Sequence, residues 1–214
     1  GWVDSSQEAM TGPMMGHAQI HAPEWREEQA PDLVIENLEE TLANVRAADG
    51  VEQAYARIYA PALAARDVDG HASVIVGIDI AAESEQGGLL QGLPPEGRPV
   101  DHSVLVGSIL ARDAGIEVGD EIAVLGSAAD GSMANDLVTV AGIISTPMDL
   151  VNRLGSVMPI ATAQEIFAMP DRAHEINVRG GGIEETDALA ATLRRVEGVE
   201  GLEVLTWREL APEL

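Results

Sequence analysis

The sequence predicts an α+β protein organised as a discontinuous domain of two βαβ-like units with an inserted small α/β subdomain. A strand–helix–strand pattern occurs near both ends of the chain, and the helix in each pattern is followed by a similar junction, DGVE at 49–52 and EGVE at 197–200. The stretch between the two patterns has an apolar core of its own. We therefore assign residues 1–90 and 162–214 to a split βαβ-repeat subdomain and residues 91–161 to the insertion.

The first βαβ-like unit begins with residues 14–21, where apolar and polar side chains alternate as in a half-buried strand. Residues 33–48 predict an amphipathic helix, because their apolar side chains recur at helical spacing at Ile35, Leu38, Leu42 and Val45. Residues 51–59 and 71–80 predict two strands, with the connection between them around Pro61 and Asp69-Gly70.

The insertion is expected to start with a helix that Ser103 caps and Gly115 ends. A strand follows around residues 122–124, where apolar and other side chains alternate. Asp130-Gly131 predicts a turn, and residues 137–146 form an apolar strand.

The second βαβ-like unit repeats the order of the first. Residues 175–178 predict a short strand, Gly180-Gly181-Gly182 a flexible joint, 187–196 a helix and 202–205 the closing strand. Two such units can pack together only if the chain between them leaves the domain and returns, which is why we expect a discontinuous domain.

Composition excludes several classes of function. The formal net charge is −24 and all 12 basic residues are arginines, so the surface should repel phosphate backbones and nucleic acid is not an expected partner. The absence of cysteine excludes disulfides, zinc fingers and thiol catalysis. No apolar run approaches the roughly 18 residues expected of a membrane span.

Candidate metal and cofactor residues have simpler explanations. His17 and His21 have the spacing of a helical metal pair, but on a strand they lie roughly 13 Å apart, so we expect solvated strand-face histidines. His174 is likewise expected at the surface, and Glu83 in a solvated acidic region. Gly180-Gly181-Gly182 has the position of a phosphate loop but lacks its Lys and Ser/Thr. We therefore predict no catalytic residue, no cofactor and no metal ligand.

Some side chains are candidates for contact with other molecules. Trp2 and Trp207 lie near opposite ends of the chain and are candidate membrane-proximal residues, with ordinary partial burial as the alternative. Four further residues are candidate partner contacts: Met14, Met15, Ser132 and Met133. For the methionine pair, core filling is the alternative.

Several short motifs occur in order along the chain: Gly16-His17-Ala18-Gln19-Ile20-His21, Val76-Gly77-Ile78-Asp79, Val106-Gly107 with Leu110-Ala111, Gly119-Asp120, Val140-Ala141-Gly142-Ile143, Met158-Pro159 and Thr206-Trp207-Arg208-Glu209-Leu210. Together they resemble the extracytoplasmic domain of MacB/FtsX/LolE-type ABC transporter permeases, the MacB-like periplasmic core domain. The resemblance implies a porter-like split subdomain and a sabre-like insertion. It also implies membrane segments of roughly 20 apolar residues before Trp2 and after Leu214.

The resemblance also implies a function. A cytoplasmic ABC ATPase subunit would drive paired permeases, and this domain, on the extracytoplasmic face of the inner membrane, would transmit the motion to export or release a lipoprotein, peptide or drug-like substrate. A second permease copy or paralogue and a periplasmic or outer-membrane protein are the implied partners. Carrier-binding relatives use a projecting hook in the insertion, whereas the matching link at 127–136 is short and rich in Gly and Ala. Lipoprotein hand-off by that route is therefore not expected.

A PDZ-like peptide-binding module is the alternative. Residues 114–122 are similar to the turn that precedes a strand in PDZ domains, where a peptide adds to the edge of a sheet. Such a module would be soluble and would bind the C-termini of peptides.

Overall fold

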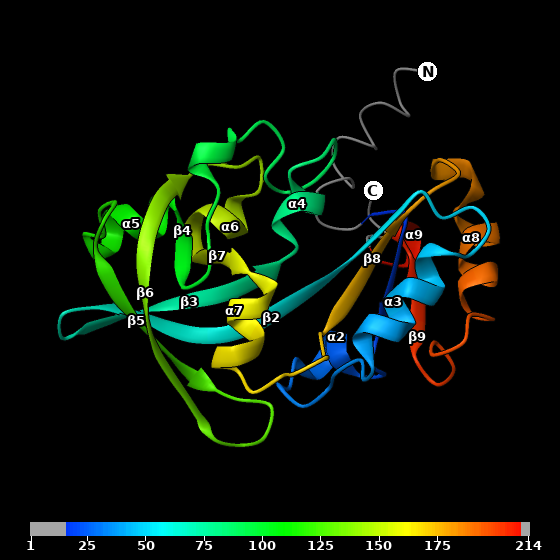
Figure 1. Cartoon of the computed structure of the whole chain (residues 1–214), viewed down its shortest axis with the longest axis horizontal. Coiled ribbons are helices and arrows are strands. Elements are labelled where there is room, and N and C mark those ends of the chain that lie inside the picture. The colour runs from blue at the N-terminus through cyan, green and yellow to red at the C-terminus, as the bar shows by residue number, and fades with distance from the viewer. Residues whose placement is uncertain (1–15, 211–214) are drawn as a thin grey trace. The chain divides into compact units, whose positions relative to one another are not determined.

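The computed structural model describes residues 16–210, and the chain divides into two compact units (Figure 1). Unit 1 comprises residues up to Arg57, Glu85–Gln91 and the chain from Asp171 onward, and unit 2 comprises Ile58–Ser84 and Gly92–Pro170. Helices and strands are mixed in an α+β fold, as predicted. The bounds of the units differ from the predicted 1–90, 91–161 and 162–214, because the chain enters unit 2 within a strand and not at residue 91.

Unit 1 contains a four-stranded sheet in the order β2-β8-β1-β9. It is formed by β1 (Ala18–His21), the first part of β2 (Gln53–Arg66), β8 (Glu175–Arg179) and β9 (Glu203–Thr206). All neighbours in it are antiparallel, and Ile20 of β1 lies opposite Ile176 of β8 and Val204 of β9. These three side chains are buried, so the register places apolar residues together in the core.

The helices of unit 1, apart from the last, connect strands that are not neighbours. They are α2 (Trp25–Glu28), α3 (Leu38–Arg46), the 3₁₀ turn Ile183–Glu185, α8 (Thr186–Leu193) and α9 (Trp207–Leu210). β1 and β2, joined through α2 and α3, flank β8, whereas β8 and β9, joined through α8, flank β1. The two βαβ units are therefore interleaved, which is the split βαβ arrangement of ferredoxin-like folds.

Helix α3 is shorter than the predicted range 33–48 because another segment fixes its N-terminus. Asn37 adopts a left-handed conformation with φ +48° and has no side-chain cap bond. Asp171 supplies the missing acceptors: its carbonyl accepts from Leu38 N at 3.0 Å and its Oδ1 accepts from Glu39 N at 2.8 Å. The start of α3 is thus set by a residue more than 130 positions away.

Unit 2 contains six strands whose pairing closes on itself. They are the second part of β2, β3 (Asp69–Ile78), β4 (Ser103–Gly107), β5 (Glu121–Ser127), β6 (Met133–Ile144) and β7 (Gly155–Pro159). Their order is β2-β3-β7-β4-β6-β5, and β5 pairs back with β2. We call this closed sheet the barrel. Because the sheet is closed, each of its strands pairs with a neighbour on both sides over at least part of its length.

The barrel interior is filled with branched apolar side chains. Inward positions are fully or almost fully buried, among them Ile58, Ile75, Leu105, Ile122, Val138 and Val157. Short helices lie in the connections: α4 (Ile80–Glu83), the 3₁₀ turn Pro95–Gly97, α5 (Ser108–Ala114), α6 (Asp149–Leu154) and α7 (Ile160–Ile166). Unit 2 is therefore mainly β, with helices confined to its connections.

Two predictions about unit 2 are wrong. Ser103 does not cap a helix; residues 103–107 form the fully buried strand β4, and the helix begins at Ser108. The strand is fixed by its pairing with β6 on one side and β7 on the other. Gly107 allows close packing at its end, where a Cβ would lie 2.1 Å from the Val151 carbonyl oxygen. Pro61 is not part of the connection but lies within β2, between the segment that pairs with β8 and the one that pairs with β5, and the turn lies at 67–68, directly before Asp69-Gly70.

Candidate functional site

The predicted contact residues Ser132 and Met133 lie at the turn between β5 and β6. Asp130 Oδ1 accepts from Ser132 N at 2.9 Å and from Ser132 Oγ at 2.6 Å, and these bonds lower the pKa of Asp130. Met133 is 79% exposed beside this ordered turn. Trp2, Met14 and Met15 lie outside the described residues.

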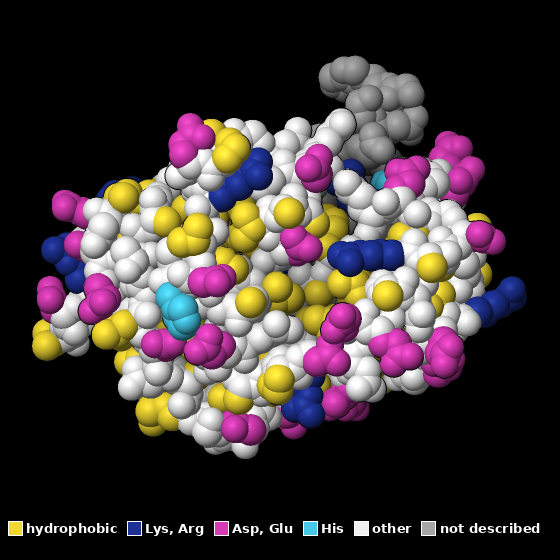
Figure 2. Space-filling model, viewed as in Figure 1, with side chains coloured by type: hydrophobic (Ala, Val, Ile, Leu, Met, Phe, Trp, Pro, Cys, Tyr) yellow, Lys and Arg dark blue, Asp and Glu magenta, His cyan; other side chains and the backbone are white. Residues whose placement is uncertain are grey.

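An apolar face of the barrel adjoins this turn. Leu63 of β2 lies opposite Leu125 of β5, and Ala123 of β5 lies opposite Leu137 of β6. Leu63 is 46% and Leu137 52% exposed. The large exposed hydrophobic residues of the described chain all belong to unit 2: Leu63, Val68, Val100, Val118, Met133, Leu137, Ile143 and Leu150. Figure 2 shows hydrophobic side chains interspersed with acidic ones on the face in view.

Trp207 is buried in unit 1. Only 4% of it is exposed, its backbone N–H donates to the His17 carbonyl at 3.1 Å, and the Arg208 guanidinium lies 5.3 Å from its ring centre. This placement corresponds to the packing alternative, and the ring does not offer an exposed surface to a bilayer.

The histidines of β1 are buried, so the prediction of solvated strand-face side chains is wrong. All four residues of β1 are buried, which means that both faces of the strand are covered. His17, just before it, accepts at Nδ1 from the Gly180 N–H at 2.9 Å. A Cβ on Gly180 would lie 1.8 Å from the Gly50 carbonyl oxygen. Gly180 therefore serves close backbone packing beside His17, where we had predicted only a flexible joint.

His21 and His174 are neutral at physiological pH because of their surroundings. His21 is fully buried; burial and the neighbouring Arg26 guanidinium lower its pKa to about 4. Its Nδ1 lies 3.5 Å from Glu203 Oε2. His174, predicted at the surface, is 1% exposed and stacks on Trp25 with ring centres 4.1 Å apart. Its Nε2 lies 3.2 Å from the Pro31 carbonyl, and burial lowers its pKa to about 4.

The acidic residues near α4 are not a solvated cluster. Asp79 caps α4, its Oδ1 accepting from Ala82 N at 3.0 Å, and Glu83 is fully buried. Among the residues that the structure describes, no group of three or more His, Cys, Asp or Glu side chains is arranged to hold a metal ion. Within the same part of the chain, none of the helices combines the length and apolar character needed to span a bilayer.

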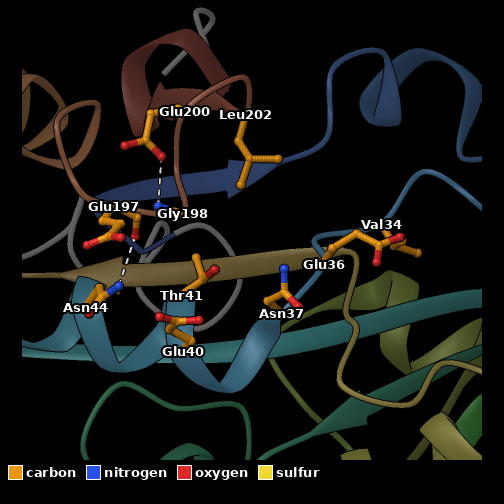
Figure 3. A pocket seen from close by; sticks show the side chains of 10 residues that line it. All are labelled: Val34, Glu36, Asn37, Glu40, Thr41, Asn44, Glu197, Gly198, Glu200 and Leu202. Carbon is orange, nitrogen blue, oxygen red and sulfur yellow. Dashed lines mark hydrogen bonds between the residues drawn. The ribbon is translucent and has the colours of Figure 1, made fainter.

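Unit 1 contains a recess (Figure 3). It has a volume of about 340 Å³ and lies between α3, the segment before it and the loop that joins α8 to β9. Its lining residues are Val34, Glu36, Asn37, Glu40, Thr41, Asn44, Glu197, Gly198, Glu200 and Leu202. Asn44 Nδ2 donates to the Glu197 carbonyl at 3.2 Å, and Gly198 N donates to Glu200 Oε2 at 2.8 Å. The first bond joins the loop to α3, and the second lies within the loop.

The sequence prediction missed this recess, although one signal for it was present. Polar residues at 37, 40, 41 and 44 recur at helical spacing and form a polar stripe on α3. The stripe faces the EGVE junction at 197–200, which we had used only as evidence for the repeat. The proximity of the two segments follows from the tertiary fold and not from either sequence.

The PDZ-like alternative is not favoured by the structure. Residues 114–122 lead into β5, which pairs with β6 over 121–127 and with β2 over 123–126. β5 therefore has no free edge over most of its length to which a peptide could add as a further strand.

Comparisons with known proteins show what this fold resembles. A comparison with protein-family models gives no match, and neither does one with curated proteins. Among solved structures, the extracellular domain of the noncanonic ABC-type transporter YknZ from Gram-positive bacteria matches at 14% identity with a TM-score of 0.58, covering 88% of this chain and 98% of that one. The periplasmic region of MacB from Actinobacillus actinomycetemcomitans matches at 11% identity with a TM-score of 0.59, covering 96% and 95%. The chain thus has the fold of these extracytoplasmic transporter domains.

Proposed function

We propose that the chain is the extracytoplasmic domain of an ABC transporter permease subunit, and that it transmits ATP-driven conformational change without catalysing a reaction. The observation that carries the proposal is the match to the MacB periplasmic region over almost the whole of both chains, at 96% and 95% coverage. A match of that extent includes both compact units, so the similarity is not limited to one widespread motif.

The division into units supports a mechanical role. Each unit has its own buried core, and the backbone passes between them at four points, Arg57–Ile58, Ser84–Glu85, Gln91–Gly92 and Pro170–Asp171. Closely packed cores move as bodies, and changes of conformation concentrate at the connections between them. In this proposal, motion in the membrane part of the transporter displaces the units and so releases or exports the substrate.

The distribution of exposed side chains supports a docking role for unit 2. Its apolar barrel face and Met133 offer surface to a second permease or to a periplasmic or outer-membrane protein, while the ATPase would act through the membrane part. The β5–β6 connection is a tight turn in which Ala128 N donates to the Ser132 carbonyl at 2.9 Å. It is too short to form a long hook-like loop, so the proposal does not include hand-off of a lipoprotein to a carrier by that route.

A single-cysteine experiment tests the proposal. The chain contains no cysteine, so Met133→Cys in the full-length native protein, with any cysteine outside this chain replaced, gives one labelling site. We expect a membrane-impermeant maleimide to label it in intact cells from the extracytoplasmic side. Ala134→Cys is the matched control. Ala134 is the next residue along the chain and is only 2% exposed, so a cysteine there should not react. Labelling of Met133→Cys only after permeabilisation would overturn the proposed location.

A fluorophore on the same cysteine tests the mechanical part. In the reconstituted transporter, we expect its emission to change when ATP is added and to stay unchanged with a hydrolysis-deficient ATPase subunit. An emission that does not respond to ATP, in a transporter shown to be active, would contradict the transmission of motion to unit 2 while leaving the location intact.

A further inference from the structure

The carboxylates of the recess in unit 1 divide into two kinds. Glu36 is paired with Arg172, whose NH2 lies 3.2 Å from Glu36 Oε2, and Glu200 accepts from the Gly198 N–H. Among the described residues, the side chains of Glu40 and Glu197 have neither an ion pair nor a hydrogen bond. Two of the four carboxylates are therefore engaged within the protein and two remain available to a ligand.

Thr41 supplies a second, independent observation. The residue is 2% exposed and lines the recess, and its hydroxyl has no hydrogen-bond partner among the described residues. A Cβ on Gly198 would lie 2.6 Å from Thr41 Oγ1, so a side chain at position 198 would clash with the hydroxyl in this position. Because the rest of the side chain is enclosed, this hydroxyl can form a hydrogen bond only with water or a ligand that lies in the recess.

We propose that the recess binds a guanidinium group. The recess offers several hydrogen-bond acceptors: the two available carboxylates, the Thr41 hydroxyl, and the side-chain amide oxygens of Asn37 and Asn44. The Nδ2 of Asn44 already donates to the Glu197 carbonyl. A guanidinium is planar, always charged and carries five N–H donors, so it can satisfy several acceptors at once. The volume of about 340 Å³ accommodates this group together with its aliphatic stem.

Other cations fit the recess less well. A calcium ion takes six to eight oxygen ligands, and the described residues hold no cluster of three or more metal-binding side chains. An ammonium group is compact and strongly hydrated, so it cannot reach carboxylates on both walls of an open recess. The proposal does not depend on the transporter role, because it rests on the recess alone.

Titration of the 214-residue chain with N-acetyl-argininamide, followed by calorimetry and by NMR shifts, tests the proposal. We expect a dissociation constant of about 1 mM, because exposed ion pairs contribute little each. N-acetyl-citrullinamide, a neutral isostere, should not bind, and N-acetyl-lysinamide should bind at least about fivefold more weakly. Added salt should weaken the binding of the arginine compound.

Matched variants locate the site. Glu40→Gln with Glu197→Gln should weaken binding at least about tenfold. Glu28→Gln with Glu39→Gln changes the net charge equally at exposed positions outside the recess and should change binding less than about twofold. Thr41→Val removes only the hydroxyl and should weaken binding about 3- to 10-fold without lowering thermal stability.

The outcomes separate the possible sources of the guanidinium. A pentapeptide with a central arginine that binds more tightly than N-acetyl-argininamide indicates a polypeptide ligand, and equal binding indicates a small molecule; both support the proposal. Equal binding of arginine and citrulline compounds, or equal losses in the recess and control pairs, would overturn it. A Thr41→Val variant that binds normally would remove the hydroxyl from the site and contradict the argument made for it.

Discussion

Acid should destabilise unit 1 through two buried histidines. His21 and His174 each have a pKa of about 4 in the folded chain, against 6.5 for an unperturbed histidine. Between these values the unfolded chain binds protons that the folded chain does not. The free energy of unfolding must therefore decrease as the pH falls through 6.5 and must stop decreasing on this account near pH 4.

The magnitude follows from the two pKa values. One pKa unit corresponds to about 1.4 kcal/mol, so the full shift amounts to about 3 kcal/mol for each histidine. Between about pH 7 and about pH 5, where only part of the shift acts, each should remove about 2 kcal/mol of stability, or about 4 kcal/mol together. Such a loss is a large fraction of the stability of an ordinary domain.

Urea unfolding followed by tryptophan fluorescence is the assay. Trp25 and Trp207 both belong to unit 1, and Trp25 stacks directly on His174. His174→Phe keeps an aromatic ring on Trp25 but cannot be protonated, so it should abolish about 2 kcal/mol of the loss between about pH 7 and pH 5. His71→Gln changes a histidine in unit 2 and should leave this loss unchanged.

Two results would refute the reasoning. The first is a decrease of less than about 1 kcal/mol in the free energy of unfolding of the wild-type chain over this pH range. It would mean that the two imidazole rings are protonated while the chain stays folded. An unchanged pH dependence in His174→Phe would mean that other groups cause the acid sensitivity.

Three further substitutions test the packing of the fold by thermal and urea unfolding. Asp171→Ala removes the acceptor for Glu39 N and should cost about 1 kcal/mol, whereas Asp187→Ala, at an exposed site in α8, should cost less than about 0.5 kcal/mol. Gly180→Ala places a Cβ against the Gly50 carbonyl oxygen and should cost about 3 kcal/mol or more; a loss below about 1 kcal/mol would show that the two backbones are not in close contact. Ser73→Ala removes a hydroxyl that donates to the Leu154 carbonyl at 2.9 Å and lies 2.8 Å from Ser156 Oγ. It should lower the free energy of unfolding by about 1–2 kcal/mol, and an unchanged value would contradict the hydrogen bond to Leu154.

The sequence predicted the βαβ repeat because its signals are local. The helical spacing in 33–48 and in 187–196, and the glycine after each helix, depend on residues close together along the chain. The closed barrel could not be predicted in this way, because its closure depends on pairings such as that of β2 with β5, whose register joins residues about 60 positions apart. Periodicity identifies a strand but not its partner.

The errors about single residues have the same origin. Residues 103–107 form a short apolar run, which periodicity alone cannot assign to a helix or a strand. The alternation before Pro23 correctly indicated a strand, but it could not show that both faces of β1 are covered, so His17 and His21 were placed in solvent. The recess was missed because Thr41 and Gly198 come together only through the tertiary fold.

The interleaving of the two βαβ units determines when each part of the chain can fold. The last residue of unit 2 is Pro170, so the barrel can close as soon as that residue has been made. β1 must wait for β8 and β9, since Ala18 pairs with Val178 and Thr206, and long loops must be closed before those contacts form. During synthesis, β1 therefore remains unpaired after the barrel has closed. This order leaves the strand edges of unit 1 open to chaperones and to aggregation until β8 and β9 have been made.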